Sequence, residues 1–209
     1  MAIHQSVSEC QHCAAGSPDW RRRSPVLTDA HVTLRGLQQA DAPSLLAHLS
    51  RPSVQHYTTP CPASLEGMQH FIRWTHAERR RGLHLCHGIV PAGNVRPVGI
   101  VQIWAIERDF STAEWGFVLS DEYWGTGLFI SGARLLLDFA FGTLGVRRLE
   151  ARAVDVDARG NAVLRKLGAT REGVLRGDFR DGDVMRDHIM WSILADEWCA
   201  LRGGRQQPH

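Results

Sequence analysis

Two glycines, Gly125 and Gly127, stand just before an apolar stretch with helical spacing. Glycine lowers helix stability but permits positive backbone φ angles, so this pair indicates a turn that a larger side chain would obstruct. The first N–H groups of a helix have no partner within it, and the helix dipole is positive there. The stretch from Trp124 to Phe129 therefore predicts either a tight turn or an anion site made of backbone N–H groups.

Two phosphate motifs built on glycines are incomplete here. The dinucleotide fingerprint Gly-x-Gly-x-x-Gly would need a glycine where Ile130 stands, and no acidic residue ends a suitable second strand about 20 residues later. A P-loop requires Gly-Lys-Ser/Thr after its first glycine, and this chain lacks that sequence there. The remaining interpretation is a strand, a glycine turn and a helix N-terminus.

Alternating and helical patterns predict the elements that position this turn. Strand patterns cover residues 31–37, 83–90, 96–107, 111–120, 146–154, 171–180 and 184–194. Helical patterns cover residues 41–50, 64–82, 128–140 and 159–168, with Asp41 as a candidate N-cap. Three prolines within residues 51–63 favour a loop there.

This order, β-α-α-β-β-β-α-β-α-β-β, predicts an α+β fold with a mixed, mostly antiparallel sheet of about six or seven strands and about four helices. We expect the chain to divide into a loosely ordered N-terminal extension (1–25), one domain (26–200) and a C-terminal tail (201–209).

Composition limits the function classes. The chain has 209 residues and a formal net charge of +2, which disfavours nucleic-acid binding through a broad basic surface. We find no apolar stretch of membrane-spanning or secretory type, so the expected location is cytoplasmic. Cys10, His12, Cys13 and His4 cluster near the N-terminus, but their spacing matches no complete zinc motif, and we predict no metal.

Several motifs occur in an order that resembles one family. "YWGTGLF" follows "AEWGFVLS" and precedes an amphipathic helix, a strand and "LRKLGATREGVLR". Together these resemble the GCN5-related N-acetyltransferase (GNAT) family over residues 26–198, and within it the RimJ/RimL-like branch, which acetylates protein N-termini or small amines. The resemblance implies the GNAT fold, with two splayed strands forming a cleft for the co-substrate acetyl-CoA.

The resemblance also implies which residues hold acetyl-CoA. N–H groups at the family's phosphate motif would bind the pyrophosphate, and the backbone of the preceding strand would hold pantetheine. The implied residues are Phe117, Val118, Leu119, Trp124, Gly125, Thr126, Gly127, Leu128 and Phe129. Thr126 stands where a lysine is frequent, so backbone donors would carry more of the binding, and Phe129 replaces a small residue. Asn161 would either contact the pantetheine arm or cap its helix.

For catalysis, the resemblance points to Glu114, at a strand position where the family frequently places a glutamate. It would act as the general base, although a salt-bridging role on the strand face remains open. The family's tyrosine acid is replaced by Leu164, so the thiolate would leave without one. Candidate acceptor-site residues are Tyr57, Trp74, Asp178, Asp187 and His188.

Two classes of function follow from the resemblance. The first is an N-acetyltransferase acting on a peptide N-terminus or a small amine, with no nucleic-acid or membrane partner and as a possible homodimer. The second is a family member that binds acyl-CoA or a protein without catalysis, since the tyrosine, serine and asparagine of the family's pattern are missing.

Overall fold

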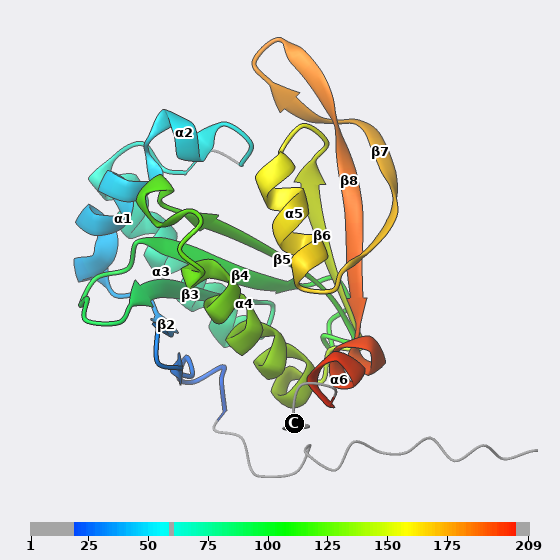
Figure 1. The fold of residues 1–209 in the computed structure, drawn as a ribbon. Coiled ribbons are helices and arrows are strands. Elements are labelled where there is room, and N and C mark those ends of the chain that lie inside the picture. The colour runs from blue at the N-terminus through cyan, green and yellow to red at the C-terminus, as the bar shows by residue number, and fades with distance from the viewer. Residues whose placement is uncertain (1–18, 59–60, 204–209) are drawn as a thin grey trace, which may run out of the picture.

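The computed structural model describes residues 19–58 and 61–203, and its eight strands form one sheet in the order β1-β2-β3-β4-β5-β6-β8-β7 (Figure 1). Neighbouring strands are antiparallel except for β5 and β6, which are parallel. The strands are β1 (Leu27–Thr28), β2 (Val32–Gly36), β3 (His84–Pro91), β4 (Gly99–Ala105), β5 (Thr112–Leu119), β6 (Arg148–Val154), β7 (Thr170–Asp181) and β8 (Val184–Leu194). The α+β class and the mixed, mostly antiparallel sheet are confirmed, and the eighth strand is the two-residue β1.

Six α-helices connect and cover the strands, where about four were expected. They are α1 (Ala42–Leu49), α2 (Pro52–Gln55), α3 (Leu65–Arg81), α4 (Leu128–Phe139), α5 (Ala158–Lys166) and α6 (Ala195–Gly203). The expected loop at 51–63 contains α2, because Pro52 occupies the first helical position, where its missing N–H is not needed. α6 extends beyond the expected domain end, and its Trp198 is buried.

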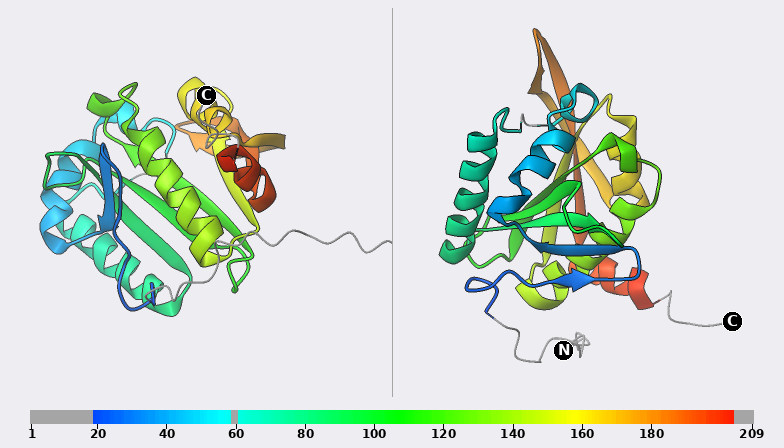
Figure 2. Two further views of the ribbon diagram at one scale, coloured as in Figure 1. Left: turned by 60° about the horizontal axis from the view of Figure 1, so that its bottom comes forward. Right: turned by 90° about the vertical axis from the view of Figure 1, so that its left-hand side faces the viewer.

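The helices lie on both faces of the sheet (Figure 2). α4 lies on the first face, where Leu136 and Leu137 are fully buried, and α5 packs there against β6. α1 and α3 lie on the second face, where they contact β3, β4 and β5. On that second face, the side chains of β6, β7 and β8 therefore lie beyond the area that α1 and α3 cover.

β5 and β6 separate after a short parallel contact. Their paired residues are Thr112–Glu114 with Arg148–Glu150. Ser120 donates its N–H to the Val98 carbonyl on the β4 side. Since backbone groups alternate sides along a strand, Val118 faces β4, whereas Phe117 and Leu119 present their backbone to the gap beside β6. The splayed pair of strands is thus present.

Asp41 does not cap α1 as the sequence suggested. Its side chain makes no capping bond to the helix; it is fully buried and forms a two-bond ion pair with Arg35 at 2.7 and 2.9 Å. It also accepts the Gln38 N–H and contacts Arg96. A charge with no exposure requires such partners, and Arg35 on β2 supplies them.

Packing begins before the expected domain start at residue 26. Trp20 is buried, and its ring lies edge-on to Phe110, with 5.4 Å between the centroids. Arg79 of α3 donates to the carbonyls of Trp20 and Arg21. At least residues 20 and 21 therefore belong to the packed domain.

Candidate active site

The glycine turn has the backbone that its sequence predicted. Gly125 and Gly127 have φ angles of 76° and 85°, and Gly127 is the N-cap of α4. A Cβ at either position would meet nothing within 4 Å, so the backbone conformation explains these glycines and steric crowding does not. The Thr126 hydroxyl donates to the Tyr123 carbonyl and receives the Leu128 N–H. The N–H groups of Phe129 and Ile130, in the first turn of the helix, have no intrahelical acceptor.

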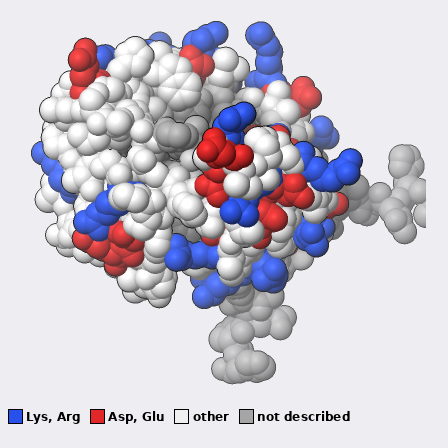
Figure 3. Space-filling view, turned by 90° about the horizontal axis from the view of Figure 1, so that it is seen from above, with Lys and Arg blue, Asp and Glu red and all other residues white. Residues whose placement is uncertain are grey.

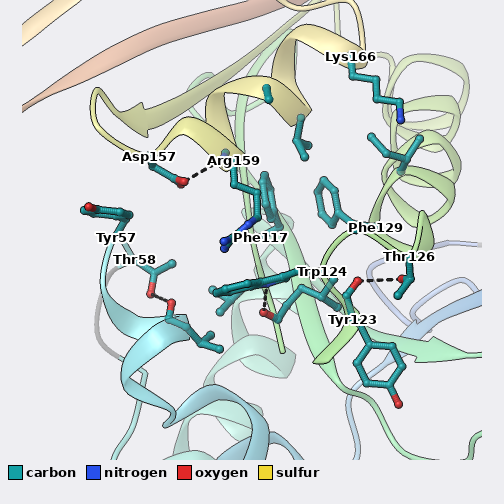
Figure 4. Close-up of a pocket in the computed structure, with 18 of the residues that line it drawn as sticks. Tyr57, Thr58, Phe117, Tyr123, Trp124, Thr126, Phe129, Asp157, Arg159 and Lys166 are labelled. Carbon is teal, nitrogen blue, oxygen red and sulfur yellow. Dashed lines mark hydrogen bonds between the residues drawn. The ribbon is translucent and has the colours of Figure 1, made fainter. Parts of the chain in front are cut away.

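This turn and the splayed edge of β5 open into one cavity of about 440 Å³ (Figure 4). α2 and α5 complete its walls. The lining includes Val54, Tyr57, Thr58, Phe117, Val118, Leu119, Trp124, Gly125, Thr126, Gly127, Phe129, Arg159, Gly160, Val163 and Lys166. Eight of the ten residues implied for acetyl-CoA binding therefore meet around the same space.

The other two, Leu128 and Asn161, do not line the cavity. Leu128 is buried in the core below the turn. The Asn161 amide donates to the carbonyls of Val154 and Asp157 and accepts from Trp191 Nε1, so its polar atoms are already engaged. Asp157 is the residue that caps α5, through the Gly160 N–H. Asn161 joins α5 to β6 and β8, and the alternative of contact with pantetheine loses its geometric support.

Two cations on α5 were missed by the sequence reasoning. Arg159 and Lys166 both line the cavity, and the Arg159 guanidinium lies 3.4 Å from the centre of the Trp124 ring (Figure 4). Trp124 is itself fixed by donating its indole N–H to the Leu119 carbonyl. The absence of a lysine at position 126 therefore does not leave the anion side of the cavity without positive charge. The placement of Arg159 and Lys166 depends on how α5 packs against the sheet, and no local sequence motif predicts that packing.

Phe129 forms part of the cavity wall. Its ring centre lies 3.9 Å from that of Phe117 and 6.3 Å from that of Trp115. The three rings form an aromatic block between α4 and β5. Phe129 therefore shapes the cavity by packing on the strand, and it lines the same cavity as the glycine turn.

Glu114 lies at the last position where β5 pairs with β6, and its side chain faces the second side of the sheet. Its carboxylate accepts from Trp104 Nε1 at 3.3 Å and lies 3.6 Å from Arg152 Nε. Its side chain is 17% exposed. Burial raises the pKa of Glu114 above its ordinary value, against the opposing effects of Arg152 and Trp104. A carboxyl with a raised pKa is better matched to accepting a proton from an amine.

The candidate acceptor-site residues separate into two groups. Trp74, which is 44% exposed, lies near His84, which in turn lies near Trp104, the partner of Glu114. Asp178 and His188 are bonded to each other on the far side of Arg152. Tyr57 instead lines the cofactor cavity, and Asp187 accepts the N–H of Gly177.

Acidic and basic side chains occur together on the side of the molecule that carries the β7–β8 hairpin. In Figure 3, acidic and basic side chains alternate on the side of the β7–β8 hairpin, while the opposite side is largely uncharged. In residues 19–58 and 61–203, no helix combines the length and apolarity needed to cross a bilayer. The same residues contain no group of three or more His, Cys, Asp or Glu side chains suited to a metal. The candidate ligands His4, Cys10, His12 and Cys13 lie outside them.

Comparison with known families decides what this architecture is. Residues 31–170 match the model of the acetyltransferase (GNAT) domain. The chain belongs to the GNAT acetyltransferase family. Members of this family are N-acetyltransferases that use acetyl-CoA as the co-substrate, and the fold described above is the GNAT fold.

Individual relatives are more distant. A spermidine N(1)-acetyltransferase of Escherichia coli is 26% identical over 178 residues, which cover 83% of this chain and 92% of that protein. A probable N-acetyltransferase of Bacillus subtilis, YjcK, is 32% identical over 108 residues, covering 51% of this chain and 60% of YjcK. The structure of Mycobacterium smegmatis RimJ superposes with a TM-score of 0.74 at 20% identity, covering 88% of this chain and 97% of that one, and shows the shared fold.

Proposed function

We propose that this GNAT protein transfers an acetyl group directly from acetyl-CoA to a primary amine while both are bound. One observation carries the proposal: the glycine turn at the N-terminus of α4 and the unpaired edge of β5 line a single cavity. The glycine turn suits a pyrophosphate, and the unpaired edge of β5 suits the amide groups of pantetheine. A thioester linked to both would reach the gap near Glu114.

In this proposal, the backbone N–H groups of Gly125, Thr126, Gly127 and Phe129 bind the pyrophosphate, since the Leu128 N–H already donates to the Thr126 hydroxyl. Phe117 presents its N–H and carbonyl to the gap and Leu119 its N–H, since the Leu119 carbonyl already accepts from Trp124, and an N–H there can polarise the thioester carbonyl. Arg159 and Lys166 add the positive charge that Thr126 lacks. Bound acetyl-CoA supplies the activated acetyl group.

Replacing Gly127 with valine tests the phosphate cradle. A β-branched residue at φ 85° strains the backbone by about 1–3 kcal/mol and tilts the N–H groups that follow. Charge-assisted hydrogen bonds are each worth about 1.5–3 kcal/mol, so we expect about a 10- to 100-fold rise in the Kd for acetyl-CoA, measured by calorimetry.

Gly145→Val is the matched control. Gly145 has a φ of 76°, also with open space for a Cβ, but it lies beyond the far end of α4. Its variant should lose similar stability while keeping the wild-type Kd. An equal rise in Kd for both variants would assign the Gly127 effect to folding.

Glu114 is proposed as the general base. At pH 7 well under 1% of a lysine-type amine is neutral, whereas roughly 10–20% of an α-amino group is neutral. The carboxylate takes the proton, the amine nitrogen attacks the thioester carbonyl, and the C–S bond breaks. The thiolate leaves without a side-chain acid from α5, where Leu164 is buried.

We further propose a peptide N-terminus or a small amine as the acceptor, as in the RimJ/RimL-like branch. The names of two relatives support this choice, since one is a spermidine acetyltransferase and another is RimJ. The aromatic rings of Trp74 and Trp104 lie near the Glu114 carboxylate, and such a group suits a cationic amine.

The test is acetyl-CoA binding by calorimetry followed by thiol release with a panel of peptides and polyamines. We expect binding and release with at least one acceptor. Binding without release from any member of the panel would instead favour an acyl-CoA-binding protein without catalysis.

A further inference from the structure

A histidine–aspartate pair lies beside Glu114 on the second face of the sheet. His188 on β8 is opposite Val154 at the end of β6, and its Nδ1 lies 2.8 Å from Asp178 Oδ2. The Asp178 carboxylate can only accept from the ring, so in the neutral imidazole Nδ1 carries the hydrogen and Nε2 carries the lone pair. Among the described residues, Nε2 has no hydrogen-bond partner. The side chain is 16% exposed, so Nε2 can meet a bound molecule.

A β-bulge brings Asp178 to this position. The register of β7 against β8 shifts between Leu175 and Phe179. Within the shift, Gly177 has a φ of 64° and donates its N–H to Asp187 at 2.8 Å. Bulges re-aim side chains beside functional sites, and this one is held by a glycine and a carboxylate. Asp178 therefore meets His188 because of a specific irregularity in the strand.

Charged groups from three strands surround His188. Arg152 of β6 lies between Glu114 of β5, at 3.6 Å, and Asp178 of β7, also at 3.6 Å. The ring of Phe179 lies 5.3 Å from that of His188. The bonded pair and Glu114 thus flank one arginine at the end of the β5–β6 gap where the strands separate.

The reaction requires two proton removals from the same nitrogen. An ammonium acceptor loses one proton before attack and a second after the C–N bond has formed. We propose that His188, oriented by Asp178, is a second proton acceptor in the active site, working with Glu114 on the acceptor nitrogen. This inference rests on the proposed acetyl transfer and adds a catalytic residue to it.

Two side chains accept the two protons that the acceptor nitrogen loses. Glu114 takes the first proton, and the amine lone pair forms the C–N bond to the thioester carbonyl carbon. His188 Nε2 takes the second proton from the tetrahedral adduct, and Asp178 stabilises the imidazolium. The adduct collapses, the C–S bond breaks, and the electron pair leaves with the CoA thiolate. Solvent then receives the proton held by Glu114 and the imidazolium proton, because both side chains are partly exposed.

His188→Asn is the decisive variant. Its side-chain amide can replace Nδ1 and keep the bond to Asp178, but it has no counterpart of Nε2. With an acceptor on which the wild type is active, we expect kcat to fall about 10- to 100-fold, with the Kd for acetyl-CoA within about twofold. His70→Asn, at an exposed histidine on α3, should leave both unchanged.

A chemical readout separates catalysis from structure. His188→Ala should lose at least as much activity, and added imidazole should restore part of it. Wild-type kcat in His188→Asn, or a loss in His188→Ala that imidazole leaves untouched, would overturn the inference. If His188→Ala no longer binds acetyl-CoA, its loss of activity reflects altered structure. The kcat of His188→Asn then decides whether His188 accepts a proton. Failure of the acetyl transfer itself would appear separately, as absence of thiol release by the wild type.

Discussion

Replacing Glu114 with glutamine is expected to lower kcat about 100-fold at pH 7 with a lysine-type amine. The loss should be smaller with a peptide N-terminus, and it should shrink as the pH rises toward the pKa of the acceptor, because less proton removal is then needed. Glutamine can still accept from Trp104 Nε1, so the local geometry is preserved. The measurement is thiol release between pH 6 and 10, about the range over which the two amines titrate.

Stability gives this prediction an independent check. Burial raises the pKa of Glu114 in the folded state, so the ionised carboxylate lowers the free energy of unfolding as the pH rises through that pKa. Glutamine removes this cost, so the variant should be at least as stable as the wild type at neutral pH while being slower. Glu66→Gln, at an exposed glutamate on α3, is the charge-matched control and should keep the wild-type rate. An unchanged pH–rate profile in Glu114→Gln would remove Glu114 from the role of base.

Asp41→Asn is expected to lower the free energy of unfolding by about 3–5 kcal/mol, because it leaves a largely buried Arg35 without its carboxylate. Burial alone would raise the pKa of Asp41, but hydrogen bonds from Arg35 and Gln38 hold this pKa below its ordinary value. The stabilisation from Asp41 is therefore complete above its unfolded pKa and is lost as the pH falls through the folded value. Denaturant unfolding at neutral and acidic pH measures the difference.

An exposed ion pair provides the comparison for Asp41. Arg51 bonds Asp121 at 2.7 Å, but both side chains are about one-third exposed. Asp121→Asn should lower the free energy of unfolding much less than Asp41→Asn does, because solvent screens an exposed ion pair. Similar losses in the free energy of unfolding for Asp41→Asn and Asp121→Asn would show that the buried Asp41–Arg35 pair stabilises the fold no more than an exposed pair does.

The sequence predicted those parts of the site that depend on local backbone chemistry. Gly125 and Gly127 indicated a turn with positive φ, and alternating side chains indicated the strand at Phe117 to Leu119. Each of these signals comes from neighbouring residues. They were sufficient to anticipate one wall of the cavity and the approximate course of the sheet.

The parts that sequence reasoning missed depend on tertiary contacts. Arg159 reaches Trp124 only because α5 packs beside the gap, and Asp178 reaches His188 only through the bulge at Gly177. Asp41 preceded a helix as a cap would, but the approach of Arg35 from β2 decided its role. The capping preference of a residue such as aspartate does not decide its role when its charge is buried, because a buried charge needs a partner that can be distant in the sequence.

The short contact between β5 and β6 has a consequence for how the protein folds. Strands β1 to β5 pair in sequence order, and β7 and β8 form a hairpin that pairs with β6. Three residue pairs of the sheet join these two groups of strands. These two units are therefore joined mainly by the side chains of one hydrophobic core cluster, to which both groups of strands contribute. A ligand that bridges the gap would couple the two units, and its occupancy would raise the cooperativity of unfolding as well as the stability.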